Sequence, residues 1–396
     1  MLKKHILKRN YKMEMVNVKA IVNGKIILED EIVEGSALIY DEKIVNMVNN
    51  HEVGRFNVDS IIDAKGNYVS PGFIDLHIHG SGGYDTMDGT YEAQSIISKT
   101  IIKNGVTSYL PTTMSMSKEC IKKALENIRG ISIKDGARIL GVHLEGPFIN
   151  PKFKGAQRED YIIKPDYDFI KDYLDIIKII TFAPEMDEDF EFMDKMKKHG
   201  NVVLSMGHTN GTFEEAIRAI ENGVNYGTHV FNAMSGLHHR KPGVLGALFS
   251  RDVYCELIGD TIHVHKGLFE VFIHINGKER VILVTDSMRA GSMECGEYEL
   301  GGQRVIVDEN SARLEDNTLA GSILKLNEAV KNIRDNTKYN IREVVNMATV
   351  NPAKAIGMYD KIGTIKRGKS ADLVIFDEDI NILKTIINGK VFYEVV

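Results

Sequence analysis

PGFIDLHIHG, residues 71–80, gives the first indication of both the fold and the chemistry of this chain. Its apolar residues predict a short buried strand that ends in a histidine pair. Residues i and i+2 of a strand point to the same face, so His77 and His79 project together while Ile78 turns into the packing. Two imidazoles on one face can bind a metal ion, although they can also be hydrogen-bonded histidines beside a turn. The rest of the chain has to decide between these two interpretations.

Between about residues 72 and 357, apolar strand-like runs alternate with amphipathic helical stretches. The eight expected strands are residues 73–79, 105–112, 139–146, 177–185, 201–209, 224–234, 253–264 and 280–287. Near-continuous apolar strands joined largely by helices predict an α/β protein with a (β/α)8 TIM-type barrel. A doubly wound open sheet is the alternative, and the number of strands disfavours it.

The two ends of the chain have a different pattern, with short alternating strands and no long helical period. Asn23-Gly24 and Asn388-Gly389 are typical hairpin turns. We therefore expect a small β-sandwich domain formed from both termini, residues 1–70 plus 358–396, and a barrel domain of residues 71–357. Residues 1–14 are expected to be a loose tail, with Met13 or Met15 as the true start.

After the eighth expected strand, residues 294–314 predict a hairpin insertion. Two closing helices follow it. The first is expected to open near Ser322, and the second to end at Gly357, a plausible C-cap.

Composition narrows the class of protein. The chain has 396 residues, of which 43% are hydrophobic and 26% charged, as in ordinary globular proteins. A formal net charge of −6 gives no support to nucleic-acid or membrane partners. Cys120, Cys255 and Cys295 are isolated, which fits a reducing, cytoplasmic location. The basic N-terminus lacks the apolar core of a signal peptide, and no apolar run is long enough to span a bilayer.

Further metal-ligand side chains fall at the ends of other predicted strands. In a barrel these ends meet at one rim, where the active site lies. The candidate ligands are His77, His79, Glu145, His208, His229 and Asp286. Each has an ordinary explanation when taken alone; Asp286, for example, could be a helix N-cap. Their coincidence at strand ends favours a metal centre, and histidine and carboxylate ligands without thiolate suit one or two ions of Zn²⁺, Fe²⁺, Mn²⁺ or Co²⁺.

Such a centre predicts hydrolysis. A metal ion lowers the pKa of bound water and polarises a carbonyl, and Asp286 is the expected proton shuttle to a leaving amine. The sequence has no Gly-x-Ser-x-Gly elbow, no Gly-x-Gly-x-x-Gly after the first strand and no Walker loop, so a covalent serine or a nucleotide cofactor is unsupported. The residues alone lead to a metal-dependent hydrolase of a C–N bond.

Several motifs in order, PGFIDLHIHG, HLEGPF, GTHVFNAM, VTDS, LAGS and GKSADLVIFD, resemble the amidohydrolase superfamily and, within it, the N-acetylglucosamine-6-phosphate deacetylases. The similarity runs from about Val18 to Phe392. It implies a barrel with a small β-domain, and hydrolysis of the acetamide of N-acetylglucosamine 6-phosphate to glucosamine 6-phosphate and acetate. It also implies a primary metal site of Glu145, His208 and His229, a second site with His77 and His79 as in two-metal members, and Asp286 as the catalytic acid/base.

The resemblance further implies how the substrate is bound. Asn232 and Ala233 match the segment that holds the sugar phosphate, and Arg240 matches an arginine that reaches the phosphate across a homodimer interface. The other matched substrate contacts are Ala156, Gln157, His263, Leu319, Ala320 and Gly321. At Gln157, single-metal members carry a histidine that helps to polarise the amide carbonyl. Glutamine can donate a hydrogen bond but cannot become cationic, and it could also be an ordinary loop residue.

Three alternatives stay open at this point. A cyclic-amide hydrolase or a deaminase is one, but cyclic-amide hydrolases usually carry a lysine at the end of the fourth strand, where this chain has TFAPE. A deacetylase for N-acetylgalactosamine 6-phosphate is harder to separate, because the two sugars are epimers. A catalytically inactive binding protein is the third, and the complete set of ligand candidates counts against it.

Overall fold

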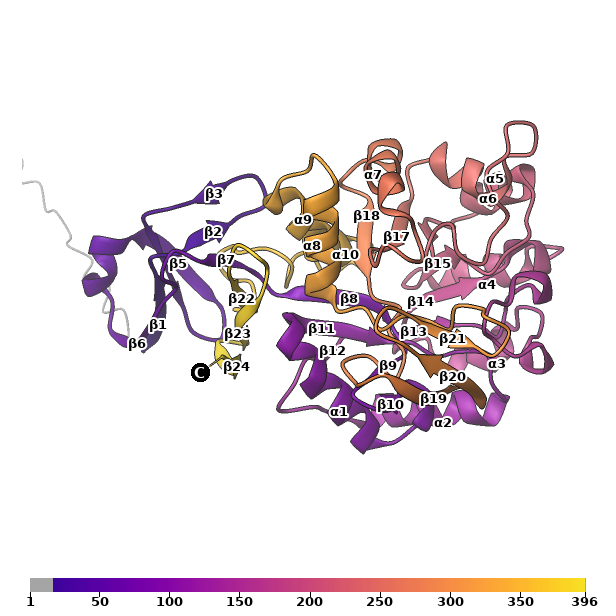
Figure 1. Cartoon of the computed structure of the whole chain (residues 1–396), viewed down its shortest axis with the longest axis horizontal. Coiled ribbons are helices and arrows are strands. Elements are labelled where there is room, and N and C mark those ends of the chain that lie inside the picture. Colours follow the sequence, from indigo (N-terminus) through magenta and orange to yellow (C-terminus); the bar gives the residue numbers. More distant parts are fainter. Residues whose placement is uncertain (1–16, 396) are drawn as a thin grey trace, which may run out of the picture.

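A computed structural model describes residues 17–395 of the chain. The predicted tail, residues 1–14, and the candidate start methionines therefore lie outside the described residues. Figure 1 shows a smaller group of strands from both chain ends beside a larger body in which strands and helices alternate. Within residues 17–395, no helix combines the length and the apolar character needed to cross a membrane.

The larger body contains two sheets of parallel strands. One consists of β8 (Phe73–Ile78), β11 (Val106–Pro111) and β12 (Arg138–Ile139). The other consists, in chain order, of β13 (Val142–Glu145), β14 (Ile177–Phe182), β15 (Val203–Met206), β16 (Tyr226–Gly227), β17 (Tyr254–Ile258) and β18 (Val281–Val284). All neighbouring pairs are parallel. A strand lies within each of the eight predicted ranges, so this expectation is confirmed.

Single bridges connect the two sheets at both of their junctions. Thr112, after β11, pairs in parallel with His143 of β13. Ile78 of β8 pairs in parallel with Ser287, after β18. These strands are buried on both faces, because every residue of β8 and β11 is shielded from solvent. This burial is the reason that they read as near-continuous apolar runs.

Helices follow most of these strands and surround them (Figure 1). Ile121, Leu125 and Ile128 of α2 share one buried face at helical spacing, and the Ser117 side chain accepts a hydrogen bond from the first turn. The helices are α1 (Tyr91–Ile101), α2 (Lys118–Gly130), α3 (Tyr167–Ile170), α4 (Glu191–His199), α5 (Phe213–Glu221), α6 (Gly243–Phe249), α7 (Phe269–Asn276), α8 (Leu326–Asn336), α9 (Ile341–Met347) and α10 (Val350–Ala355). One large apolar cluster joins these helices to the parallel strands.

Strands from both chain ends form the smaller body. A four-stranded sheet has the order β5-β4-β1-β6, and a six-stranded sheet has the order β24-β23-β22-β7-β2-β3. The strands are β1 (Val18–Val22), β2 (Lys25–Ile27), β3 (Ile32–Val33), β4 (Ser36–Tyr40), β5 (Ile44–Asn49), β6 (Val58–Asp63), β7 (Tyr68–Pro71), β22 (Leu373–Phe376), β23 (Ile382–Ile387) and β24 (Lys390–Glu394). β22 pairs antiparallel with β7, so the two chain ends share one sheet. One buried cluster takes residues from both sheets, for example Leu38 and Leu373.

Only one of the two predicted hairpin turns forms a hairpin. Asn388 and Gly389 both have positive φ and connect β23 to its antiparallel partner β24. The prediction at Asn23-Gly24 is wrong, because β1 and β2 belong to different sheets. Asn23 still has positive φ, so the turn is present but carries the chain from one sheet to the other.

The region after β18 departs from its prediction in two places. The insertion has three strands, β19 (Gly296–Leu300), β20 (Gln303–Val307) and β21 (Ala312–Leu314), of which the first two form the expected hairpin. The first closing helix, α8, begins at Leu326 and not near Ser322. The second is divided into α9 and α10, which places Pro352 in the first turn of α10, where a missing N–H is tolerated. Gly357, with φ +68°, follows the end of α10.

Candidate active site and metal centre

The predicted ligands lie together at the carboxyl ends of the parallel strands. Glu145 is the last residue of β13, and His79 directly follows β8. His208, His229 and Asp286 each stand two residues beyond their strands, β15, β16 and β18. All six predicted ligands are buried, and the most exposed, Asp286, is only 8% exposed.

Glu145 stands between two groups of side chains. Its Oε1 atom lies 3.1 Å from His208 Nε2 and 3.0 Å from His229 Nε2, and these two nitrogens are 3.1 Å apart. Its Oε2 atom lies 3.3 Å from His79 Nε2. His77 Nε2 is 3.4 Å from His79 Nε2 and 3.6 Å from Glu145 Oε1. The structure therefore brings both predicted sets of metal ligands together around one carboxylate.

Asp286 joins the second group. Its Oδ1 atom lies 3.2 Å from His79 Nε2 and 3.4 Å from His77 Nε2. Burial raises the pKa of Asp286, but the imidazoles of His77 and His79 outweigh it and hold this pKa well below its usual range. The carboxylate is therefore ionised at neutral pH.

The hydrogen bonds behind the rings test whether a cation fits here. His208 Nδ1 donates to the Phe153 carbonyl over 2.8 Å, and His77 Nδ1 lies 2.9 Å from Glu256 Oε2. Because a carbonyl and a carboxylate only accept, both rings carry a proton on Nδ1, and in the neutral form of each ring the Nε2 atom presents a lone pair. Converging lone pairs repel one another unless a positive charge lies among them. The donor set thus fits divalent metal ions, and histidine with carboxylate suits zinc or iron.

The negative charge of the surrounding carboxylates also indicates that a cation fits at this centre. Burial lowers the pKa of His77, but Glu256, Asp286 and Glu145 together raise it to about 9. A buried group of carboxylates that favours a protonated imidazole also favours a metal cation in its place.

The backbone at this rim is strained. His208, His229 and Asp286 have φ of +48°, +26° and +50°, a region that residues other than glycine seldom adopt. Each such residue costs about 1–3 kcal/mol, and such strain is concentrated at functional sites. Sequence patterns do not predict this backbone strain. It arises beyond the end of each strand, where the chain bends so that the side chain of the ligand residue points to the centre.

A cavity of about 380 Å³ opens above the two groups of ligands. Seven of the predicted substrate contacts line it: Ala156, Gln157, Asn232, Ala233, His263, Leu319 and Gly321. Ala320 is fully buried between two of these residues and is not part of the lining. Arg240 is exposed on a loop outside the cavity, where its guanidinium contacts His239 Nε2 at 2.7 Å.

Sequence reasoning missed several residues at the site, and three of them carry an ionisable side chain. Arg313, from β21 of the insertion, lines the cavity, and no periodic pattern reveals how an insertion folds back. Asp260 Oδ2 lies 2.6 Å from His263 Nδ1 and orients that ring. Glu256 contacts the Nδ1 atom of His77. The only sequence feature that could have indicated this role is the presence of a carboxylate in the middle of an apolar strand.

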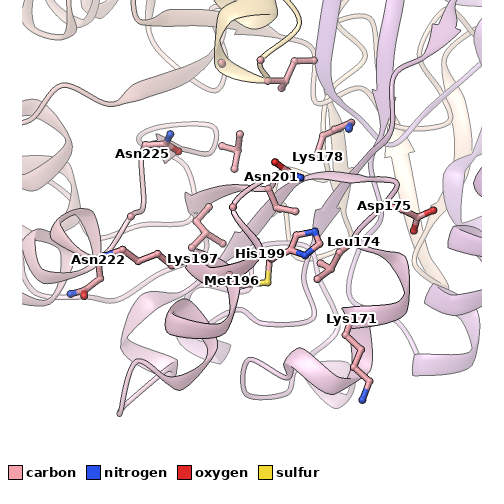
Figure 2. Close-up of a pocket in the computed structure, with 18 of the residues that line it drawn as sticks. Lys171, Leu174, Asp175, Lys178, Met196, Lys197, His199, Asn201, Asn222 and Asn225 are labelled. Atoms are coloured by element: carbon pink, nitrogen blue, oxygen red, sulfur yellow. The ribbon is translucent and has the colours of Figure 1, made fainter.

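A larger hollow of about 1080 Å³ opens at the other ends of the strands (Figure 2). Lys178, near the start of β14, and Asn201, just before β15, both line it. Within residues 17–395, the histidine and carboxylate groups arranged to hold a metal ion all lie elsewhere. The smaller cavity is therefore the candidate active site.

Comparison with known proteins agrees with this geometry. The model of the amidohydrolase family matches residues 68–392. The N-acetylglucosamine-6-phosphate deacetylase of Bacillus subtilis is 36% identical over 378 residues, which cover 93% of this chain and 95% of that protein. The crystal structure of the enzyme of that name from Pasteurella multocida has a TM-score of 0.89 and 34% identity, covering 94% of this chain and 99% of that one.

A second similar structure contains a ligand. A mutant N-acetyl-D-glucosamine-6-phosphate deacetylase from Mycobacterium smegmatis, in complex with N-acetyl-D-glucosamine-6-phosphate, has a TM-score of 0.87 and 26% identity, covering 95% of this chain and 100% of that one. The extent of these matches, in sequence and in structure, shows that this chain belongs to the amidohydrolase family and, within it, to the N-acetylglucosamine-6-phosphate deacetylases.

Proposed function

We propose that this protein hydrolyses the acetamide of N-acetylglucosamine 6-phosphate to glucosamine 6-phosphate and acetate. The observation that carries this proposal is the convergence of two histidine pairs, Glu145 and Asp286 beneath one cavity. The relatives named above, and the sugar phosphate bound in one of them, support the choice of substrate.

The proposed architecture is a closed (β/α)8 barrel, residues 71–357, with a small β-sandwich of residues 1–70 and 358–396. The bridges Thr112–His143 and Ile78–Ser287 support closure, since they connect the two parallel sheets at both junctions. The shared sheet of β7 and β22 supports a discontinuous second domain. Closure would explain why side chains from five different strands meet at one point.

In the proposed centre, Glu145, His208 and His229 hold a primary metal ion, and His77 and His79 hold a second one beside Asp286. Zinc or iron suits these ligands best, and manganese or cobalt is compatible with them. A divalent cation at this centre supplies Lewis acidity, which lowers the pKa of water and polarises a carbonyl.

Asp286 is the proposed general base and acid. Its carboxylate is at the wall of the cavity, where it can take a proton from the attacking water and deliver it to the leaving amine. Gln157 is the proposed partner of the amide carbonyl. The Ser115 N–H donates to Gln157 Oε1 over 2.8 Å, which turns the Nε2 donor towards Glu145 Oε2, 3.0 Å away, and towards the cavity.

The proposed phosphate site is formed by Asn232, Ala233 and Arg240. Because Arg240 lies outside the cavity of its own chain, we propose that it serves the site of the second subunit in a homodimer. His263, held by Asp260, and the segment from Leu319 to Gly321 would contact the sugar. Cys120, Cys255 and Cys295 are all free thiols, which supports a cytoplasmic location.

The proposal is tested by product analysis. Purified protein is incubated with N-acetylglucosamine 6-phosphate, and the products are followed by proton NMR before and after metal removal with a chelator. We expect equal amounts of acetate and glucosamine 6-phosphate, loss of turnover on chelation and recovery on addition of Zn²⁺. A protein that contains its metal but releases no acetate would contradict the proposal.

A further inference from the structure

Glu256, in the middle of β17, is a fully buried carboxylate with 0% exposure. Burying a carboxylate costs several kcal/mol unless it is paired with positive charge or hydrogen-bond donors. A carboxylate buried in this position therefore calls for an explanation.

One oxygen of this carboxylate serves both halves of the centre. Glu256 Oε2 lies 2.9 Å from His77 Nδ1 and accepts a hydrogen bond of 2.9 Å from the His229 main-chain N–H. His77 belongs to the proposed second metal subsite and His229 to the primary one. Through its Oε2 atom alone, Glu256 thus contacts one proposed ligand of each subsite, His77 and His229.

The contact with His77 determines what that ring can do. With its proton on Nδ1, the ring presents the Nε2 lone pair towards His79 and Asp286. The other tautomer would place a proton between these groups and exclude a cation. His79 has no such support, because its Nδ1 atom finds no hydrogen-bond partner among residues 17–395. The second subsite therefore depends on the orientation of His77.

The primary subsite does not share this dependence. His208 is oriented by the Phe153 carbonyl, and Glu145 lies on another strand. At His229, Glu256 accepts a hydrogen bond from the main-chain N–H, and no hydrogen bond or ion pair joins Glu256 to the imidazole of that residue.

We propose that Glu256 is the positioning residue for the second metal subsite: it selects the His77 tautomer that can accept an ion there and links that subsite to the primary one through His229. This inference rests on the proposed two-ion centre. It predicts that Glu256 controls whether the protein holds one ion or two.

The test is a zinc titration of the full-length protein in buffers of graded free Zn²⁺, with bound metal counted by mass spectrometry. In Glu256→Gln we expect the affinity for the second ion to fall about 10–100-fold, the range for loss of a group that orients a metal ligand, while the first ion binds as in the wild type. Asp75→Asn is the matched control. Asp75 is equally buried and contacts the His77 main chain and Thr285, but not the His77 ring, so both ions should be kept.

Three results would overturn the inference: wild-type affinities for both ions in Glu256→Gln, an equal loss of both ions, or a wild-type protein that binds only one ion. A measurement on the unmutated protein makes the test independent of how the variants fold. Histidine-selective nitrogen NMR of the zinc-loaded protein should find the His77 proton on Nδ1, and a proton on Nε2 would also overturn the inference. Because these measurements count ions and protons, they stand even if the protein fails to release acetate.

Discussion

Replacing Asp286 with asparagine tests the proton shuttle with little change in shape. The Oδ1 atom of Asp286 is 3.2 Å from His79 Nε2 and 3.4 Å from His77 Nε2, and the side chain is 8% exposed at the cavity wall. Asparagine keeps the size of the side chain and one oxygen acceptor at this position. It cannot take a proton from water or deliver one to the leaving amine. The variant should therefore bind metal and substrate but turn over slowly.

The expected loss of rate in Asp286→Asn follows from the proposed role of Asp286 as general base and acid. General acid–base catalysis contributes a factor of about 10²–10⁴ to the rate. At about 1.36 kcal/mol for each factor of ten, this corresponds to about 2.7–5.4 kcal/mol of transition-state stabilisation. Since the group acts on protons and does not anchor the sugar, kcat should carry this loss and KM should change much less.

The assay is the release of acetate from N-acetylglucosamine 6-phosphate at saturating substrate, together with the metal content of the same samples. Asp168→Asn, at an exposed ion pair with Lys171, is the control for an aspartate change without a role at the site and should retain wild-type kcat. An Asp286→Asn variant that contains its metal and keeps wild-type kcat would remove Asp286 from the mechanism.

Three further changes have distinct signatures. Arg240→Ala should raise KM for the phosphorylated sugar about 10–100-fold, since a charge-assisted hydrogen bond contributes about 1.5–3 kcal/mol; an equal effect on the unphosphorylated sugar would refute the phosphate role. Gln157→Ala should lower kcat about 10²–10³-fold if its amide donates to the carbonyl in the transition state, and unchanged kcat would show that it is a loop residue. Burial raises the pKa of Glu29, but hydrogen bonds from Lys354 and Tyr359 outweigh it and lower this pKa below 4.5. Its stabilising contribution, about 1 kcal/mol, is therefore present above pH 4.5 and lost as the pH falls through the lowered value. Denaturant unfolding should show Glu29→Gln to be weaker than wild type at pH 7, and a difference that persists fully at pH 3 would contradict this.

Local patterns predicted the parallel strands well, and they placed the candidate ligands at strand ends that the structure brings together. Burial on both faces makes such strands continuous apolar runs, and a period of two places His77 and His79 together. The turn at Asn388-Gly389 behaved as its sequence predicts. The hairpin prediction for the same dipeptide at Asn23-Gly24 is wrong. Which sheet each flanking strand joins is decided by the long-range pairing of β1 with β6 and of β2 with β7.

Other features of the site depend on contacts between distant segments. Glu256 is 179 residues from His77 in sequence, and only the packed strands bring them to 2.9 Å. Arg313 reaches the cavity because an insertion folds back over the strand ends. Arg240 is exposed outside the cavity of its own chain, and the role proposed for it requires a second subunit, which no pattern in one chain can represent.

The most direct test of the central claim compares three substrates on one sample of known metal content. Acetate release is measured from N-acetylglucosamine 6-phosphate, N-acetylgalactosamine 6-phosphate and unphosphorylated N-acetylglucosamine. We predict the highest kcat/KM for the first, a lower value for its epimer and a loss of most activity without the phosphate. Equal rates with and without phosphate, or no release from the first substrate by metal-loaded protein, would contradict the proposed function.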